Sequence, residues 1–283
     1  SDFDYVIIDE FQDISFGRFS MVDRIRNQNP NSKLFCVGDD WQAIYRFAGG
    51  DVSILYNFND YFGRYTKKLR LTKTFRLPKK VASLSDQFIK TNPSQSQKTI
   101  KTTKDIPGAV VFRTISSDKK QIQFLSIIEQ INHFAKKNDS YANILILNRY
   151  SFQRVVRDYD EIINQCKKYK NVDVQYSTIH RMKGGEADYV IVDDVNEGFV
   201  GFPNKMGEDS VLKMLLQNEE NFMDAEERRL FYVAITRCKK QVFILSTVGE
   251  SSAFFTELHH KVIDRLPCKE CGGYMIRRMN QQK

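Results

Sequence analysis

Acidic side chains follow two apolar segments that are typical of β-strands. Asp9 and Glu10 come directly after residues 3–8, and Asp39 and Asp40 come directly after residues 33–38. A carboxylate at a strand end can hold Mg²⁺, directly or through water, and a second carboxylate beside it can orient or deprotonate an attacking water. An acidic turn that caps the next helix would have the same residue types. The Asp9–Glu10 pair by itself therefore leaves both interpretations open.

An amide and two aromatic rings follow the second of these segments. Gln42 lies just past the strand end, where its side chain could touch a phosphate. Tyr45 and Phe47 flank Arg46, and aromatic rings near a cation are what a base-stacking platform requires. Ordinary core aromatics are the commoner alternative.

Two arginines and a histidine complete the candidate set. Arg76 and Arg237 could each bind a phosphoryl group in transfer, because a guanidinium offers planar, paired donors. Each of them alone could equally be a surface arginine. His180 alone is more typical of a structural histidine than of a catalytic one.

The elements that must position these residues alternate between strands and helices. The pattern predicts a parallel α/β sheet, in which ligands bind at the carboxyl ends of strands. We expect a buried strand at 3–8 and an exposed polar loop at 91–104. Further strands are expected at 33–38, 67–71, 109–115, 144–148, 172–177, 189–193 and 241–246, and helices at 15–27, 78–89, 119–137, 152–168, 211–222 and 225–238.

Composition narrows the class of protein. The chain has 283 residues, of which 41% are hydrophobic and 12% aromatic, and this excludes a mostly disordered chain. No stretch approaches the ~18 uninterrupted apolar residues of a membrane helix. The net charge is +8, and residues 73–178 hold 19 basic and 9 acidic residues, a net of +10. Clustered Lys and Arg favour a polyanionic partner, although a solvated lysine-rich surface would look the same.

The cysteines predict a reducing compartment and leave one metal question. Three of them are isolated among apolar or helical residues, as buried thiols are, and the N-terminus shows no secretion leader, so we expect a cytoplasmic protein. Cys268 and Cys271 form a C-x-x-C-G-G stretch that resembles half of a zinc ribbon. A structural Zn²⁺ needs four ligands, which His259 and His260 could complete; a disordered basic C-terminus is the alternative.

Five stretches in order carry a family resemblance. They are DEFQD at 9–13, GDDWQAIYRF at 38–47, TFR at 74–76, TIHRMKGGE at 178–186 and EERRLFYVAITR at 226–237. Together they resemble motifs II to VI of the UvrD/Rep family of superfamily 1 DNA helicases. The forms around residues 38–51 and 74–93, and GFP at 201–203, are most similar to the helicase IV branch.

The resemblance implies an ATP site. Asp9 would hold Mg²⁺ together with a Walker A Ser or Thr, and Glu10 would activate the water that attacks the γ-phosphate. Gln42 would sense that phosphate, and Arg76 and Arg237 would contact it as arginine fingers. ATP and Mg²⁺ are the implied cofactors.

The resemblance also implies supporting roles around the nucleotide. Phe75 would stack near the adenine, where relatives often carry Tyr. Glu186 would hydrogen-bond the ribose, and Gln12 would link the nucleotide site to motif III.

For nucleic acid, the resemblance implies that Tyr45 and Phe47 stack on bases of a single strand. Thr178 and His180 would touch its backbone. Single-stranded DNA and duplex junctions are the implied partners, with translocation 3′ to 5′ in DNA repair or recombination, and repair proteins or RNA polymerase as further partners. No membrane partner is expected.

The chain departs from the family pattern in three places. Gly185 replaces the usual Leu of motif V, and Trp41 stands where others have an acid. No G-x-x-x-x-G-K-[ST] phosphate-binding string occurs, so we expect the C-terminal portion of a longer helicase, inactive by itself as an ATPase.

The expected fold is RecA-like α/β. Residues 1–72 would be the C-terminal part of the first motor domain, 73–250 the second motor domain, and 251–283 a tail. The interval between Arg76 and Thr178 leaves no room for a large inserted domain. A non-enzymatic module that binds nucleic acid or RNA polymerase with a retained motor fold is the alternative, and a helicase–nuclease subunit is a weaker one.

Overall fold

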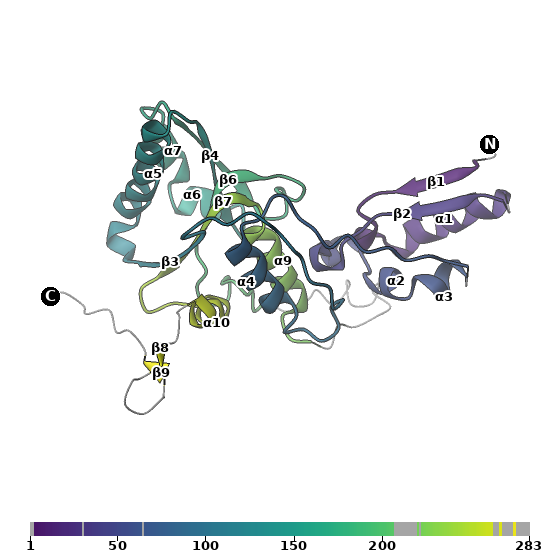
Figure 1. The fold of residues 1–283 in the computed structure, drawn as a ribbon. Helices are drawn as coiled ribbons and strands as arrows, with labels where there is room; N and C mark the ends of the chain where they lie inside the picture. Colours follow the sequence, from purple (N-terminus) through teal and green to yellow (C-terminus); the bar gives the residue numbers. More distant parts are fainter. Residues whose placement is uncertain are drawn as a thin grey trace.

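The computed structural model describes residues 3–29, 31–63, 65–206, 220 and 222–262, with the backbone of two short strands, β8 (Leu266–Pro267) and β9 (Tyr274–Met275). Within these residues the chain forms two lobes, which an extended segment at 65–78 connects (Figure 1). Most of the helix expected at 211–222, and both Cys268 and Cys271, lie outside the described residues.

The larger lobe is built on a five-stranded sheet. Its strands, in spatial order, are β3 (Val110–Ile115), β7 (Cys238–Thr247), β6 (Ala187–Val192), β4 (Ala142–Asn148) and β5 (Val172–Thr178). Every neighbouring pair is parallel. The predicted parallel α/β fold is therefore confirmed.

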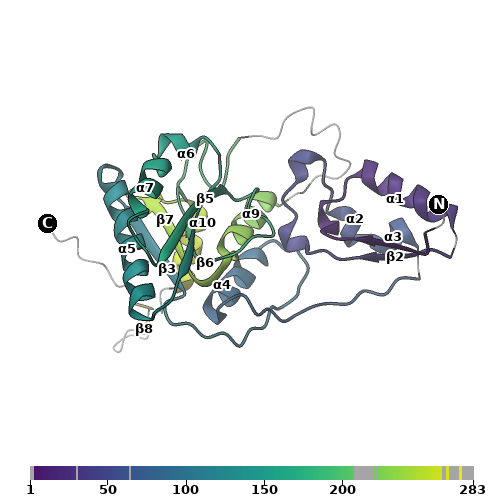
Figure 2. The same ribbon diagram turned by 90° about the horizontal axis from the view of Figure 1, so that it is seen from above.

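Helices cover both faces of this sheet (Figure 2). On β4, Leu145 and Leu147 pack toward α4 (Lys79–Ile89), α9 (Ala225–Ile235) and α10 (Ala253–Val262). The alternating side chains Ile144 and Ile146 pack toward α5 (Lys120–Lys137) and α7 (Tyr159–Cys166). Each such side chain contributes about 1.5–3 kcal/mol when fully buried. Burial on both faces explains why the central strands β4, β6 and β7 contain continuous apolar runs.

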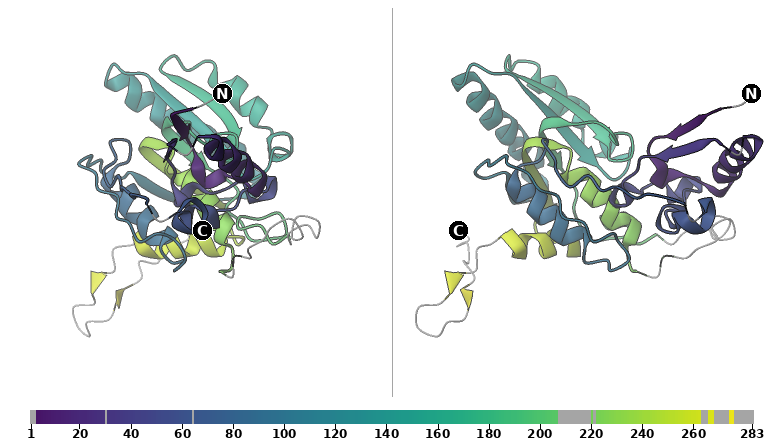
Figure 3. Two further views of the ribbon diagram at one scale, coloured as in Figure 1. Left: turned by 90° about the vertical axis from the view of Figure 1, so that its right-hand side faces the viewer. Right: turned by 45° about the vertical axis from the view of Figure 1, so that its right-hand side comes forward.

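The smaller lobe is a two-stranded parallel sheet with one helical layer (Figure 3). Strand β1 (Tyr5–Ile8) pairs with β2 (Lys33–Cys36), and α1 (Phe16–Gln28), α2 (Ser53–Tyr56) and α3 (Phe58–Phe62) complete the lobe. Val6 and Ile8 pack into its core, whereas Tyr5 and Ile7 are 64% and 72% exposed. The expectation of a buried strand at 3–8 is wrong for one face of the strand, because no described element covers that face.

Two further expectations are corrected. Residues 67–71 form no strand; they belong to the extended segment between the lobes. The helix expected at 152–168 is divided into α6 (Gln153–Val156) and α7, because Asp158 takes a left-handed backbone conformation with φ 52°.

No helix among the described residues is long and apolar enough to span a bilayer.

The motif III stretch of the smaller lobe forms two short 3₁₀ helices, and the residues in and between them pack against the larger lobe. The helices are η2 (Asp40–Gln42) and η3 (Arg46–Ala48). Trp41 and Ile44 are fully buried in the same hydrophobic cluster as α4 and α9, and the Trp41 ring centroid lies 5.4 Å from that of Tyr232. The residue that replaces an acid of the family pattern is thus a core side chain where the lobes meet.

Candidate functional site

The first carboxylate pair lies in a tight turn at the carboxyl end of β1. Glu10 has φ 49°, and its backbone N–H donates to Asp9 Oδ1 at 2.8 Å. Both side chains are exposed, although Glu10 Oε2 lies 3.4 Å from Nζ of the buried Lys183. The 3₁₀ helix η1 (Phe11–Asp13) follows and is anchored by the buried Phe11.

Gln12 connects this turn to motif III. Its side chain is 1% exposed; Nε2 donates to Glu10 Oε2, and Oε1 accepts from the Asp39 backbone N–H at 2.9 Å. The close approach depends on Gly38, because a Cβ there would lie 2.8 Å from Gln12 Oε1. One amide therefore holds Glu10 and the start of η2 in a fixed relation.

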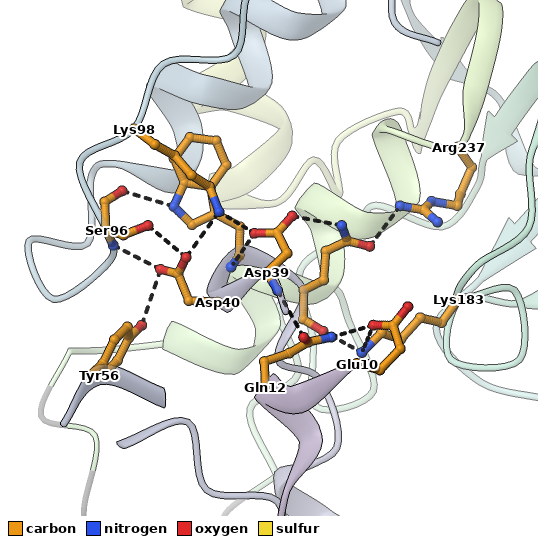
Figure 4. Close-up of polar contacts among 11 residues, drawn as sticks. Glu10, Gln12, Asp39, Asp40, Tyr56, Ser96, Lys98, Lys183 and Arg237 are labelled. Atoms are coloured by element: carbon orange, nitrogen blue, oxygen red, sulfur yellow. Dashed lines mark hydrogen bonds and ion pairs between the residues drawn. The ribbon is translucent and has the colours of Figure 1, made fainter. Parts of the chain in front are cut away.

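Gln42 of the smaller lobe contacts Arg237 of the larger lobe. Figure 4 labels Arg237 and Asp39, which lie on either side of this amide. Gln42 Nε2 donates to Asp39 Oδ2 at 2.7 Å, which turns the amide oxygen toward Arg237 Nη2, 3.1 Å away. Arg237 is held at the end of α9 by hydrogen bonds from Nε to Val233 O at 3.0 Å and from Nη1 to Gly185 O at 3.3 Å. The amide and the guanidinium expected to contact one phosphate are therefore in direct contact.

Arg76 lies close to the same place. Its Nε pairs with Glu186 Oε2 at 3.0 Å, and Lys239 Nζ pairs with Glu186 Oε1 at 2.8 Å. Burial, which is the larger cause, and the positive charge of Arg76 together lower the pKa of Arg237 to about 10. Two guanidinium groups that raise each other's electrostatic energy form a region that an anion would stabilise. Phe75, beside Arg76, is 79% exposed.

The aromatic residues of motifs III and V form a second cluster. The Phe47 ring centroid lies 5.8 Å from that of Tyr45 and 5.2 Å from that of His180, and Tyr45 Oη donates to His180 O at 3.0 Å. Phe47 is 57% exposed, so the cluster presents a ring to solvent. Thr178, which ends β5, lies two residues before His180.

His180 is neutral at pH 7. Burial lowers its pKa to about 4, and the charge of Arg149 acts in the same direction, whereas a hydrogen bond to the Ile44 backbone opposes the change. Near neutral pH this side chain offers hydrogen bonds and an aromatic edge, but no positive charge.

Lys183 is a residue of the site that the sequence reasoning missed. Its side chain is 6% exposed; Nζ pairs with Asp13, lies 3.4 Å from Glu10 Oε2 and donates to Gln42 O at 2.9 Å. Burial raises the pKa of Asp13, and Lys183 opposes this rise. The TIHRMKGGE stretch, which contains Lys183, was the only sequence signal for this residue. Its contacts with Asp13 and Gln42, about 170 and 140 residues earlier, cannot be inferred from the sequence.

The donor set at this junction fits a magnesium nucleotide. Oxygen ligands such as the exposed Asp9 carboxylate suit Mg²⁺, and paired guanidinium groups suit phosphate oxygens. Within the described residues no group of three or more His, Cys, Asp or Glu side chains is arranged to hold a metal by itself. The proposed zinc ligands Cys268 and Cys271 are outside that part of the chain.

Two family models match the chain. The UvrD/REP helicase N-terminal domain matches residues 1–63, and the UvrD-like helicase C-terminal domain matches residues 160–249. These ranges contain the carboxylate turn and Gln42 in the first match, and His180, Lys183 and Arg237 in the second.

Three curated relatives are similar to between 49% and 88% of the chain. DNA helicase IV of Escherichia coli is 34% identical over 256 residues, which are 88% of this chain and 35% of that protein. A probable DNA helicase of Mycoplasma pneumoniae is 27% identical over 87% of this chain and 44% of its own length. A putative ATP-dependent DNA helicase of Bacillus subtilis, YjcD, is 33% identical over 49% of this chain and 18% of its own length. The chain thus spans less than half the length of these relatives.

Proposed function

The chain belongs to the UvrD/Rep helicase family, and from this premise we propose that it is the C-terminal portion of an ATP-dependent DNA helicase and translocase. The whole protein would hydrolyse ATP and move 3′ to 5′ on single-stranded DNA in repair or recombination. The proposal depends above all on the contact between Gln42 of the smaller lobe and Arg237 of the larger lobe. This contact places an amide and a cation from different lobes at one position beside the Asp9–Glu10 turn.

The residues of the site have separable tasks in this proposal. Asp9 would hold the Mg²⁺, which when bound neutralises phosphate charge. Glu10, which Gln12 orients through its amide, would accept a proton from the attacking water. Arg237 and Arg76 would donate to the oxygens of the transferring phosphoryl group, where charge develops.

Glu186 and Phe75 would serve the nucleoside part of ATP. Glu186 is engaged by Arg76 and Lys239 in this structure, so a ribose hydroxyl would have to share or displace one of these contacts. Phe75 is free to stack on a base, because its ring is exposed apart from Lys73 Nζ 4.9 Å from the centroid.

DNA would bind at the aromatic cluster. Tyr45 and Phe47 offer ring faces for bases, and Thr178 and His180 offer polar groups for the backbone. Stacking tolerates every base, so a platform of this kind suits a motor that moves along DNA of any sequence.

The 283-residue chain by itself would be inactive, because it lacks the G-x-x-x-x-G-K-[ST] loop that cradles the phosphates. The remaining N-terminal motor segment is therefore a required partner, and repair proteins or RNA polymerase are further candidate partners of the whole protein.

A DNA-stimulated ATPase assay on the full-length protein tests the proposal. Hydrolysis stimulated by single-stranded DNA is expected, and the 283-residue chain at the same concentration should show none. A full-length protein that binds DNA without hydrolysing ATP would instead indicate a non-enzymatic binding module with a retained motor fold. Activity of the 283-residue chain alone would contradict its proposed dependence on the missing loop.

A further inference from the structure

The polar segment at 92–104, which follows α4, is bound to motif III. Ser96 donates to the Asp40 carboxylate from its backbone N–H at 2.8 Å and from Oγ at 2.6 Å, and Trp41 Nε1 donates to Ser96 O at 3.1 Å. This segment was expected to be an exposed loop, yet Asn92 and Gln95 are each 2% exposed. It therefore belongs to the packed junction between the lobes.

Lys98 is the charged centre of this contact. Its Nζ pairs with Asp39 Oδ1 and with Asp40 Oδ1, the latter at 3.0 Å, and lies 4.5 Å from the Trp41 ring centroid. The side chain is only 14% exposed. A lysine held in this way restricts the positions of the Asp39 and Asp40 carboxylates.

Asp39 passes the constraint to the candidate phosphate sensor. One carboxylate oxygen, Oδ1, faces Lys98, and the other, Oδ2, accepts from Gln42 Nε2. The same amide then turns its oxygen toward Arg237 (Figure 4). Lys98, Asp39, Gln42 and Arg237 thus form one continuous chain of charge-assisted contacts.

The other end of the segment holds the extended stretch that carries Arg76. Lys101 pairs with the 72–74 backbone through Lys101 N to Thr72 O at 2.7 Å and Thr74 N to Lys101 O at 2.9 Å. Lys104 Nζ donates to Arg76 O at 3.2 Å. The 92–104 segment thereby connects the surroundings of Gln42 with the backbone of Arg76.

We propose that Lys98 is a positioning residue for ATP hydrolysis, which fixes Asp39 and through it the Gln42 amide that faces Arg237. The inference rests on the proposed function. Lys98 does not reach the phosphates itself; it determines where the sensor amide lies when the reaction occurs. Asp40, which Ser96 already satisfies with two hydrogen bonds, forms the structural branch of the same cluster.

The test compares Lys98→Met, Lys98→Arg and Asp40→Asn in the full-length protein. Methionine keeps the length of the side chain and its packing on Trp41 but removes the charge. Lys136→Met, at an exposed position of α5 on the opposite face of the sheet, is the matched control.

Lys98→Met is expected to lower the DNA-stimulated kcat about 10²-fold, the size of effect that a misplaced reacting group produces. KM for ATP and the Kd of a non-hydrolysable ATP analogue should stay near the wild-type values. Lys98→Arg should recover part of kcat, Asp40→Asn should lose far less, and Lys136→Met should behave as wild type. A kcat of Lys98→Met equal to that of Lys136→Met would overturn the inference.

A second measurement tests the role of Lys98 without an ATPase assay. Trp41 is the single tryptophan of the chain, so acrylamide quenching of the 283-residue chain reports whether the 92–104 segment stays docked. Quenching of Lys98→Met should equal wild type, and the losses of melting temperature from Lys98→Met and Gln42→Ala should not add. Additive losses of melting temperature would contradict the inference. A loss of kcat that appears only together with increased quenching would also contradict it, because Lys98 would then only hold the 92–104 segment in place. A wild-type protein without ATPase activity would instead refute the proposed function itself.

Discussion

The stability of the chain should depend on pH through His180. Its folded pKa is lowered from 6.5 to about 4 by burial and by Arg149. As pH falls below 6.5, the unfolded chain takes up a proton that the folded chain refuses until pH reaches about 4. The free energy of unfolding therefore decreases as the pH is lowered from about 6.5 to about 4. Since one pKa unit corresponds to about 1.4 kcal/mol, the His180 contribution amounts to about 2 kcal/mol at pH 5 and about 3 kcal/mol when the window has been crossed.

The assay is urea unfolding of the 283-residue chain at neutral pH and at about pH 5, for wild type and for His180→Gln. Glutamine retains a donor for the Ile44 backbone but does not titrate in this range. The loss of unfolding free energy on acidification should be smaller in His180→Gln by about 2 kcal/mol. The comparison cancels the other groups that titrate between the two pH values. Equal losses in the two proteins would show that burial and the charge of Arg149 do not lower the pKa of His180.

Three further outcomes are expected. Arg237→Ala in the full-length protein should lower kcat for ATP by about 10³–10⁵, with nucleotide binding retained, and a loss below about tenfold in a kinetic assay would contradict the finger role. Phe47→Ala should weaken single-stranded DNA binding by about 1–3 kcal/mol in a fluorescence anisotropy titration. Its melting temperature should be unchanged, because the ring is exposed. Lys120→Met should lower the free energy of unfolding by about 3–5 kcal/mol, measured with urea, because it leaves the buried Asp193 and Asp194 carboxylates without their shared cation. An unfolding midpoint equal to that of wild type would show that Arg157 alone satisfies that pair.

The central strands β4, β6 and β7 of the larger lobe were predictable because they have stretches buried on both faces, where successive positions are apolar. The same signal misled at residues 3–8, where an apolar run occurs on a strand with one face open to solvent in the described part of the chain. The division between α6 and α7 was not predictable either. Arg157 pairs with Asp194, and Tyr159 bonds Asp193, so side chains on both sides of Asp158 are fixed by residues 34 to 37 positions away.

The residues of the candidate site that belong to a sequence motif were predictable. Residues outside the motifs were not, because only the folded chain brings them to their partners. Glu10, Gln42 and Arg237 were identified from five short stretches in order, and the structure brings them into one network. Lys98 lies in a polar stretch whose composition is typical of an exposed loop. Its burial follows only from two carboxylates 58 and 59 residues earlier, which hydropathy alone does not pair with it.

The arrangement of the two clusters suggests how DNA and ATP would affect each other. On the smaller lobe, Gln42 and Tyr45 are three residues apart, joined by the buried Ile44. On the larger lobe, His180 and Lys183 are also three residues apart, and they contact Tyr45 and Gln42 respectively. A shift of one lobe against the other would move the stacking cluster and the Gln42–Arg237 contact together, because both lie on the same pair of short segments. Energy coupling would then require no long pathway through the protein, because a base that displaces Tyr45 would act three residues from the candidate phosphate sensor Gln42, and one that displaces Phe47 would act five residues from it.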